Sequence, residues 1–348
     1  MDAAMNRAMR AVAPLAPFTA AALAAALLFA AFLAAQGFEA PEALGLVVEG
    51  AFGSAFAWQN TLARAAPLML TALCVALPAR AGLVIIGGEG ALALGALAAA
   101  MVPSLTAGWP ALPVQLLMAL AGFVAGGAWI AASAWLRHVR GINETISSLL
   151  LSYIGIALFN FLVEGVLRDP ASLNKPSTPP LPDAVLIGPL PGLEVHWGLV
   201  WGVLACAAAW FLLRRTVFGF SVAVVGGNPR AALMAGLPVG ALLIAACFLG
   251  GGAAGVAGML EVAAVHGSAN ASLLAGYGYA GILVSFAARH NPLGIVAGAI
   301  LVGGIGASGS LLQRRLDLPD AAVLVLQGAL FVALLAFETL NRKGARRV

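Results

Sequence analysis

Long apolar stretches dominate the chain, and short polar or glycine-rich segments separate them. Most of these stretches hold about 20 residues, the length that an α-helix needs to cross the hydrocarbon core of a bilayer. The pattern predicts an all-α, polytopic membrane protein with about ten transmembrane helices, forming a single domain over residues 1–348. The expected spans lie near residues 15–36, 62–79, 83–103, 111–136, 145–164, 197–213, 240–265, 276–289, 292–311 and 320–339. The first has no clear cleavage site, so we expect it to stay as a span.

The composition agrees with this interpretation. Of the 348 residues, 62% are hydrophobic and 9% are charged, whereas a soluble domain carries roughly 25% charged residues. These values exclude a soluble globular protein and a disordered chain. The three cysteines all fall in apolar stretches and have no metal-ligand spacing, so we expect no metal site. We assign the net charge of +4 to basic cytoplasmic loops of a cell-membrane protein, and not to a nucleic-acid partner.

The loop charges indicate which side of the membrane each loop faces. Cytoplasmic loops carry an excess of Lys and Arg. With a cytoplasmic N-terminus, 13 of the 18 cations fall on the inner side, namely Arg7, Arg10, Arg80, Arg137, Arg140, Arg214, Arg215, Arg230, Arg289, Arg342, Lys343, Arg346 and Arg347. An even number of spans also returns the C-terminus to the cytoplasm, although Arg314 and Arg315 oppose this assignment.

Two loops are long. The outer loop at about 166–196 contains seven prolines and no helical period, which predicts an ordered but irregular cap over the outer face. The inner loop at about 214–239 contains Asn228-Pro229, a typical helix start, and Gly236, a typical stop. We therefore expect a helix of about eight residues on the cytoplasmic surface.

The sequence holds no set of residues suited to covalent or metal catalysis. Its four histidines are scattered, and GxxxxGK[ST] does not occur, so we expect no enzymatic activity and no P-loop ATP site in this chain. An ATP-driven pump would need its ATPase on another polypeptide.

Polar residues inside the apolar stretches are the best candidates for a solute path, because an ionisable group costs at least a few kcal/mol in lipid unless it is paired or hydrated. The candidates combine carboxylates with neighbouring polar and aromatic residues: Glu89, Asn143, Glu144, Ser147, Tyr277 and Tyr279. Glycines surround Glu89 and predict an irregular or tightly packed backbone there. A structural role is the alternative for Glu89 and Glu144, in which each carboxylate caps a helix or pairs with an arginine such as Arg80 or Arg140.

Four segments carry a resemblance to a known family. They are RAGLVIIGGEGALALGA, INETISSLLLSYI, FGFSVAVVGGNPRAALMAGL and AVHGSANASLLAGYGYAGILVSFAARHNPLGI, and they extend from about residue 80 to 300. The combination resembles the membrane-spanning permease subunit of binding-protein-dependent ATP-binding cassette (ABC) importers. The resemblance is strongest to the branch that contains nucleoside permeases, with simple-sugar permeases as relatives.

The resemblance implies an ABC importer permease-like bundle that moves solute by alternating access. It implies a cytoplasmic ABC ATPase that carries ATP and Mg²⁺, a second permease chain in a homodimer or heterodimer, and an extracytoplasmic solute-binding protein. It implies no cofactor in this chain. The short inner helix would be the coupling helix that contacts the ATPase, and its residues would be Gly226, Asn228, Pro229, Arg230, Ala231, Ala232 and Gly236.

The substrate is less well indicated. The nucleoside branch usually has polar Asn, Gln, Asn and Asp where this chain has Ile85, Ala91, Ser152 and Ala280. We expect a nucleoside, with a simple sugar of the ribose type as the alternative. An ion-coupled secondary transporter using Glu89 and Glu261 is a further alternative, which the lack of a convincing internal repeat disfavours. A membrane-embedded enzyme or scaffold is disfavoured by the lack of clustered His, Cys or paired acids.

Overall fold

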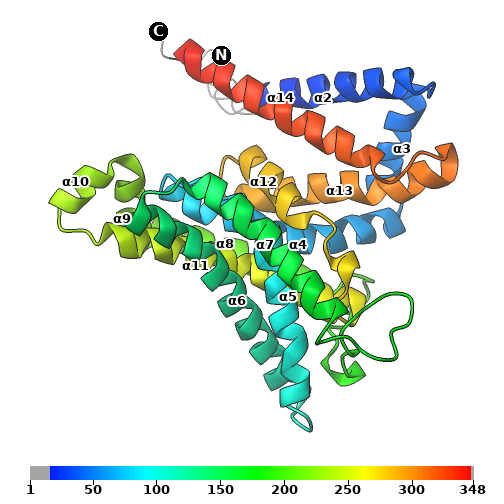
Figure 1. Cartoon of the computed structure of the whole chain (residues 1–348). Helices are drawn as coiled ribbons and strands as arrows, with labels where there is room; N and C mark the ends of the chain where they lie inside the picture. Colours follow the sequence, from blue (N-terminus) through cyan, green and yellow to red (C-terminus); the bar gives the residue numbers. More distant parts are fainter. Residues whose placement is uncertain (1–15, 346–348) are drawn as a thin grey trace. The chain divides into compact units, whose positions relative to one another are not determined.

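The computed structural model describes residues 16–345, and these residues are helical apart from connecting loops and two isolated bridges (Figure 1). The chain divides into two compact units. One unit comprises Met1–Thr61 with Leu301–Val348, and the other comprises Leu62–Ile300. Arg7, Arg10, Arg346 and Arg347, which contribute to the expected orientation, lie outside the described residues.

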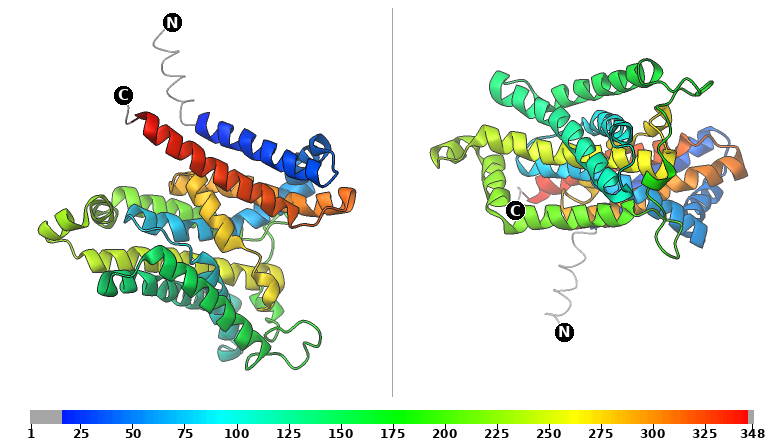
Figure 2. Two further views of the ribbon diagram at one scale, coloured as in Figure 1. Left: turned by 45° about the horizontal axis from the view of Figure 1, so that its top comes forward. Right: turned by 90° about the horizontal axis from the view of Figure 1, so that it is seen from below.

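The unit formed by the two ends of the chain contains α2 (Ala16–Ala35), α3 (Ala40–Phe52) and α14 (Ala322–Ala345). α2 and α14 pack side by side, as Figure 2 shows. The beginning of α4 (Ala55–Arg80) and the end of α13 (Pro292–Leu316) also belong to this unit.

The larger unit contains the remaining helices and the outer loop. In chain order they are α5 (Gly88–Leu105), α6 (Ala111–Arg140), α7 (Glu144–Glu164), α8 (Gly198–Arg215), α9 (Val217–Gly227), α10 (Pro229–Met234), α11 (Val239–Leu260) and α12 (Tyr277–Ala287). A π-helical turn, η2 (Glu261–His266), extends α11, and two short 3₁₀ turns lie at η1 (Asp183–Val185) and η3 (Ala271–Leu273).

The sequence pattern located most of the helices, but it did not predict α3 or α9. Among the described residues, seven helical stretches are long and apolar enough to cross a membrane: Ala55–Arg80, Gly88–Leu105, Ala111–Arg140, Glu144–Glu164, Gly198–Arg215, Val239–His266 and Pro292–Leu316. Shorter apolar stretches at Thr19–Ala35, Ala271–Ala287 and Ala322–Phe337 coincide with the other three expected spans. The polytopic helical architecture is therefore confirmed, and the count of ten is not. α12 has 11 residues, and its rise of about 16 Å is about half of a ~30 Å hydrocarbon core.

Glycines set the packing of α5, α6 and α11, which form the centre of the larger unit. A methyl group added at Gly255 of α11 would overlap the Gly122 carbonyl of α6, and one added at Gly95 of α5 would overlap Gly255. In lipid the hydrophobic effect does not drive helices together, so their association depends on close packing. Small residues allow the helix backbones to approach closely. The glycine-rich stretch at 250–258 is thus a surface for helix packing.

The outer loop is ordered and largely irregular, as expected from its prolines. Its backbone binds the segment after α11: Thr178 N–H donates to the Ala269 carbonyl at 2.9 Å, and Leu181 N–H donates to the Gly267 carbonyl at 2.8 Å. His196 ends the loop and is buried against the start of α8, and this burial lowers the pKa of its imidazole. The loop is therefore fixed to one side of the larger unit.

We predict that Gly255→Val destabilises the protein by about 1–3 kcal/mol, because the larger side chain forces α11 away from α5 and α6. Gly328→Val is the matched control, since among the described residues no atom lies within 4 Å of a methyl group added there. Thermal unfolding of the two purified variants in detergent tests this expectation. Equal melting temperatures for Gly255→Val and Gly328→Val would contradict it.

Candidate substrate path and coupling helix

The backbone between α4 and α5 leaves the helical conformation at residues 83–87. Side chains of α7 accept hydrogen bonds from its amides: Glu144 Oε1 from Val84 N–H at 3.4 Å, and Ser148 Oγ from Ile86 N–H at 3.1 Å. Ser152 Oγ continues the series one turn further along and accepts from Gly90 N–H at 3.0 Å, in the first turn of α5. The four-residue spacing puts the three acceptors on one face of α7. They satisfy amide groups that would each cost several kcal/mol if left bare in lipid.

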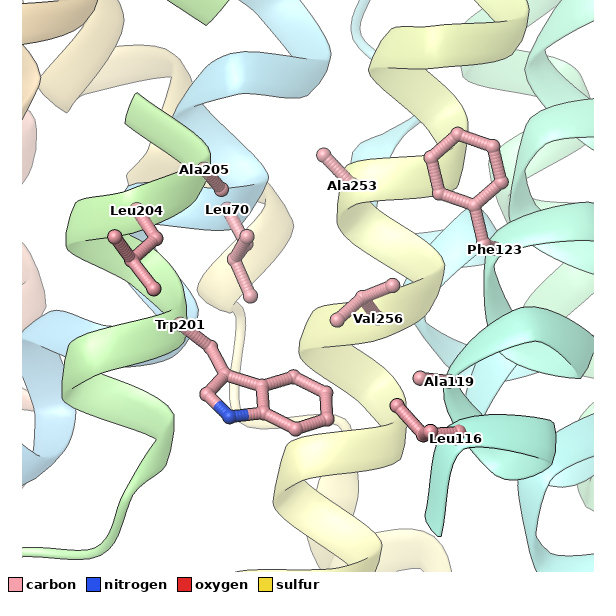
Figure 3. A pocket seen from close by; sticks show the side chains of 9 residues that line it. All are labelled: Leu70, Leu116, Ala119, Phe123, Trp201, Leu204, Ala205, Ala253 and Val256. Carbon is pink, nitrogen blue, oxygen red and sulfur yellow. The ribbon is translucent and has the colours of Figure 1, made fainter. Parts of the chain in front are cut away.

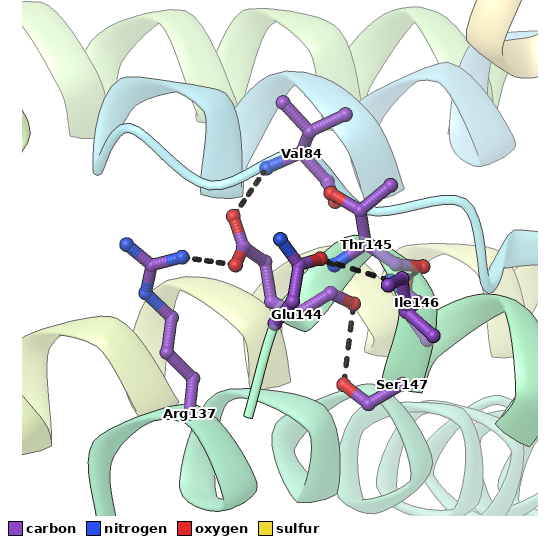
Figure 4. A network of polar contacts seen from close by, with 8 residues as sticks. Val84, Arg137, Glu144, Thr145, Ile146 and Ser147 are labelled. Atoms are coloured by element: carbon purple, nitrogen blue, oxygen red, sulfur yellow. Dashed lines mark hydrogen bonds and ion pairs between the residues drawn. The ribbon is translucent and has the colours of Figure 1, made fainter. Parts of the chain in front are cut away.

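Figure 4 shows the start of this series. Asn143 caps α7, since its Oδ1 accepts from the backbone N–H groups of Thr145 at 2.9 Å and Ile146 at 3.1 Å. Glu144 forms an ion pair with Arg137 at the end of α6. Ser147 Oγ donates to the Glu144 carbonyl at 3.3 Å, within its own helix. Asn143, Glu144 and Ser147 therefore all have structural partners.

Glu89 binds the start of α12. Its Oε1 accepts from Gly276 N–H at 2.9 Å and its Oε2 accepts from Gly278 N–H at 2.5 Å. A methyl group added at Gly278 would overlap the Glu89 backbone amide, so the first turns of α5 and α12 touch through their backbones. Two helix N-termini thus meet at one carboxylate, an arrangement that suits negative charge.

The two tyrosines lie at this junction and differ in exposure. Tyr277 is largely enclosed, and its carbonyl accepts from Thr71 Oγ1 at 3.0 Å. Tyr279 is 37% exposed, and its hydroxyl lies near Ser152 of α7. The structure therefore brings Glu89, Tyr277 and Tyr279 together with Ser152.

The other three predicted path residues lie apart from this junction. Glu144 and Ser152 are eight residues apart on α7, which corresponds to about 12 Å along the helix. Asn143, Glu144 and Ser147 therefore form a second group that fixes the start of α7. Residue types alone did not separate these two groups.

The sequence analysis did not assign the structural roles of Arg137, Ser148 and Ser152. Polar residues recur at 144, 148 and 152, and this spacing was the available signal. The arginines suggested as ion-pair partners, Arg80 and Arg140, were wrong, because the helix turn that faces Glu144 carries Arg137.

The predicted inner helix is α10, which lies at the projecting tip between α9 and α11 (Figure 1). Asn228 Oδ1 caps it by accepting from Arg230 N–H at 3.0 Å and Ala231 N–H at 3.2 Å. Gly236 follows its end with a φ of +78°, in the left-handed region that favours glycine. The helix has six residues, Pro229–Met234, where the sequence suggested about eight.

The faces of α10 differ. Ala232 is fully buried, whereas Leu233 is 61% and Met234 is 91% exposed. Ala232 belongs to a hydrophobic cluster that also contains Leu83 and Ile85 of the non-helical segment. α10 and the non-helical segment thus share one packed core. The sequence analysis did not single out Leu233 and Met234.

Gly226, the first residue of the predicted coupling set, lies in α9 and packs on the turn that ends α4. A methyl group added there would overlap the Arg80 carbonyl. This glycine therefore allows α9 to approach the start of the non-helical segment.

An open groove of about 420 Å³ lies elsewhere in the larger unit, between α4, α6, α8 and α11 (Figure 3). Its lining is apolar: Leu70, Leu116, Ala119, Phe123, Trp201, Leu204, Ala205, Ala253 and Val256. Such a lining lacks the convergent polar groups that orient a polar solute. We therefore place the candidate path at the junction of α5 and α12 and not in this groove.

A family model described as "Branched-chain amino acid transport system / permease component" matches residues 57–335, which include both the junction and α10. The chain belongs to this permease family. It is an ABC importer permease of the branch that contains nucleoside and sugar permeases. Membership makes it a multi-pass membrane protein and a non-catalytic transport subunit, and implies an ATPase and a solute-binding protein as partners.

The relatives of this permease differ in their substrates. The glucose ABC transporter permease protein TsgB13 of Haloferax volcanii is 32% identical, covering 89% of this chain and 84% of the relative. The guanosine ABC transporter permease protein NupP of Bacillus subtilis is 27% identical, with coverages of 89% and 92%. The nucleoside ABC transporter permease protein NupB of Lactococcus lactis is 24% identical, with coverages of 72% and 71%.

We predict that Ser148→Ala destabilises the permease by about 1–3 kcal/mol, because it leaves the partly buried Ile86 amide without its acceptor. Ser147→Ala is the matched control on the same helix, since its hydroxyl bonds only to a carbonyl of its own helix. Thermal unfolding and amide hydrogen exchange of residues 84–90 test this. Equal destabilisation, or unchanged exchange at Ile86 in Ser148→Ala, would contradict the proposed role of the α7 hydroxyls.

Proposed function

We propose that this permease forms the membrane path of an ATP-driven nucleoside importer and works by alternating access. Guanosine and nucleoside permeases among its relatives support the substrate class. We place the N- and C-termini in the cytoplasm, and the outer loop on the face that receives the solute-binding protein. The observation that carries the mechanism is α10, a capped helix with one buried face and exposed apolar side chains at its tip.

In this proposal the solute passes the junction where α5 meets α12. Glu89, Tyr277 and Tyr279 lie there, and the partly exposed Tyr279 offers both an aromatic face and a hydroxyl. Aromatic rings stack well on nucleobases. Asn143, Glu144 and Ser147 hold the start of α7 beside this path.

α10 is the coupling helix in this proposal. Met234, Leu233 and Ala231 are exposed and would enter a groove of the cytoplasmic ATPase, whereas Ala232 would anchor the helix in the core of the permease. Closure of the ATPase dimer on ATP and Mg²⁺ would move α10 as a rigid body. Gly226, Asn228, Pro229, Arg230 and Gly236 shape the helix and its ends.

We propose a heterodimer with a second, related permease chain. Two guanosine permease proteins, NupP and NupQ, come from the same strain of Bacillus subtilis, and both are similar to this chain. Such a pair supports an importer built from two different permeases.

A simple sugar is the second candidate substrate. The 32% identity to a glucose permease favours it.

We predict that Met234→Glu weakens binding to the ATPase by roughly thirtyfold or more and abolishes ATP-dependent uptake, because docking would desolvate an unpaired charge. Leu173→Glu, which alters a side chain of similar exposure on the outer loop, is the control. Co-purification and uptake measurements on the complete importer test this. Normal ATPase binding by Met234→Glu would contradict the assignment of α10.

We predict ATP-dependent uptake of guanosine by the complete importer in proteoliposomes, with slower or no uptake of glucose. The reverse preference would establish the sugar as substrate. Uptake driven by a proton or sodium gradient without ATP would instead indicate a secondary transporter and overturn the proposed function.

A further inference from the structure

Three carboxylates are buried in the part of the chain that the structure describes: Glu89, Glu144 and Glu261. Both oxygens of Glu89 accept backbone hydrogen bonds from the start of α12. Glu144 accepts from Val84 N–H with one oxygen and pairs with Arg137 through the other. The acceptor capacity of these two carboxylates is therefore largely used within the fold.

Glu261 differs, although it is only 3% exposed. Among the described residues, its carboxylate makes one ion pair, with Nε2 of His266 at 3.6 Å from Oε2. That distance is too long for a good hydrogen bond. Unlike Glu89 and Glu144, Glu261 thus keeps acceptor capacity on its carboxylate for a further partner. Buried polar groups without partners call for an explanation, and a ligand is one.

The backbone around Glu261 is irregular. Residues Glu261–His266 form the π-helical turn η2 at the end of α11, and π turns often occur at functional sites. The outer loop binds this turn through Ile187 N–H, which donates to the Ala263 carbonyl at 2.8 Å. The carboxylate is therefore held in a fixed position.

The neighbours of Glu261 suit a hydroxyl-rich solute. Arg64 lies within electrostatic range of Glu261 and is itself exposed. Tyr277 lies within electrostatic range of Glu261 and begins α12, and η2 contacts α5, so Glu261 adjoins the junction of α5 and α12. We call Arg64, Glu261, His266 and Tyr277 the Glu261 cluster.

A carboxylate can accept two hydrogen bonds from adjacent hydroxyl groups, as acidic residues do at the ribose of nucleotides. Vicinal hydroxyls are the feature that a nucleoside shares with a simple sugar, which are the two candidate substrates. An apolar solute or a free nucleobase lacks them.

We propose that Glu261 is a specificity-determining residue of the path, whose carboxylate accepts hydrogen bonds from a vicinal hydroxyl pair of the solute. The inference rests on the proposed function, because it concerns the solute that this permease moves. It assigns recognition of the hydroxyl pair to the Glu261 cluster, and leaves the base of a nucleoside to the tyrosines.

The test compares solutes that differ by one hydroxyl group, in the complete importer reconstituted with its ATPase, second permease and binding protein. The pairs are guanosine with 2′-deoxyguanosine, and glucose with 2-deoxyglucose. We expect Glu261→Gln to reduce the preference for the fully hydroxylated member by roughly tenfold, mainly by slowing its uptake. The binding protein is the same for both forms of the permease, so its own selectivity cancels in this ratio.

Glu194→Gln, which changes an exposed carboxylate of the outer loop, is the control and should keep the wild-type ratio. The melting temperature of Glu261→Gln shows whether this variant is folded. Glu261→Asp is a milder variant that keeps the carboxylate, and we expect its preference for the fully hydroxylated solute to fall but not to disappear. Uptake of both members of a pair falling by the same factor, or an unchanged ratio, would overturn the role of Glu261 alone.

The two proposals fail in different ways. A wild-type importer that takes up neither nucleosides nor sugars overturns the proposed function, and with it the role of Glu261. The solute pair whose uptake ratio changes in Glu261→Gln identifies the source of the hydroxyls. A change for guanosine and 2′-deoxyguanosine indicates a ribose, and a change for glucose and 2-deoxyglucose indicates a sugar ring.

Discussion

The constraint on which this permease depends is the need to satisfy backbone amides where a membrane helix is interrupted. Residues 83–87 leave the helical conformation within an apolar stretch, and lipid offers their amides no hydrogen bonds. α7 supplies the acceptors from residues at four-residue spacing. The interruption allows α5 to begin beside the short α12, and the junction of these two helices contains the candidate solute path.

The same constraint explains why the buried carboxylates of this chain have different roles. Glu144 and Glu89 each complete the hydrogen bonding of a helix end or an interrupted backbone, so their position within a span reflects structure first. Glu261 has a similar location and burial without such partners. A buried carboxylate in a membrane helix therefore marks a structural or a functional position. Its local hydrogen bonds distinguish a carboxylate that stabilises the fold from one that is available to bind a solute.

Much of the fold could be predicted from the sequence because bilayer thickness fixes the length of an apolar span. The start of α10 was also predictable, since Asn228 and Pro229 act within one turn of the chain. The pairing of Glu144 with Arg137 could not be predicted, because it depends on how α6 and α7 pack. Nor could the pattern distinguish the π turn at Glu261 from an ordinary solvated helix end, since both carry a polar residue after an apolar run. Ala232 shows the same limit: the resemblance placed it among the coupling-helix residues, whereas the direction of its side chain depends on the cluster that it shares with Leu83 and Ile85.

The shared core beneath α10 has a mechanical consequence. Ala232 of α10 and Leu83 and Ile85 of the non-helical segment belong to one close-packed cluster, and protein interiors have low compressibility. If α10 is the coupling helix, as proposed, a push on its tip would reach the non-helical segment between α4 and α5 as displacement of contacting side chains. The segment that breaks the helix would then be the part of the membrane domain most directly driven by ATP.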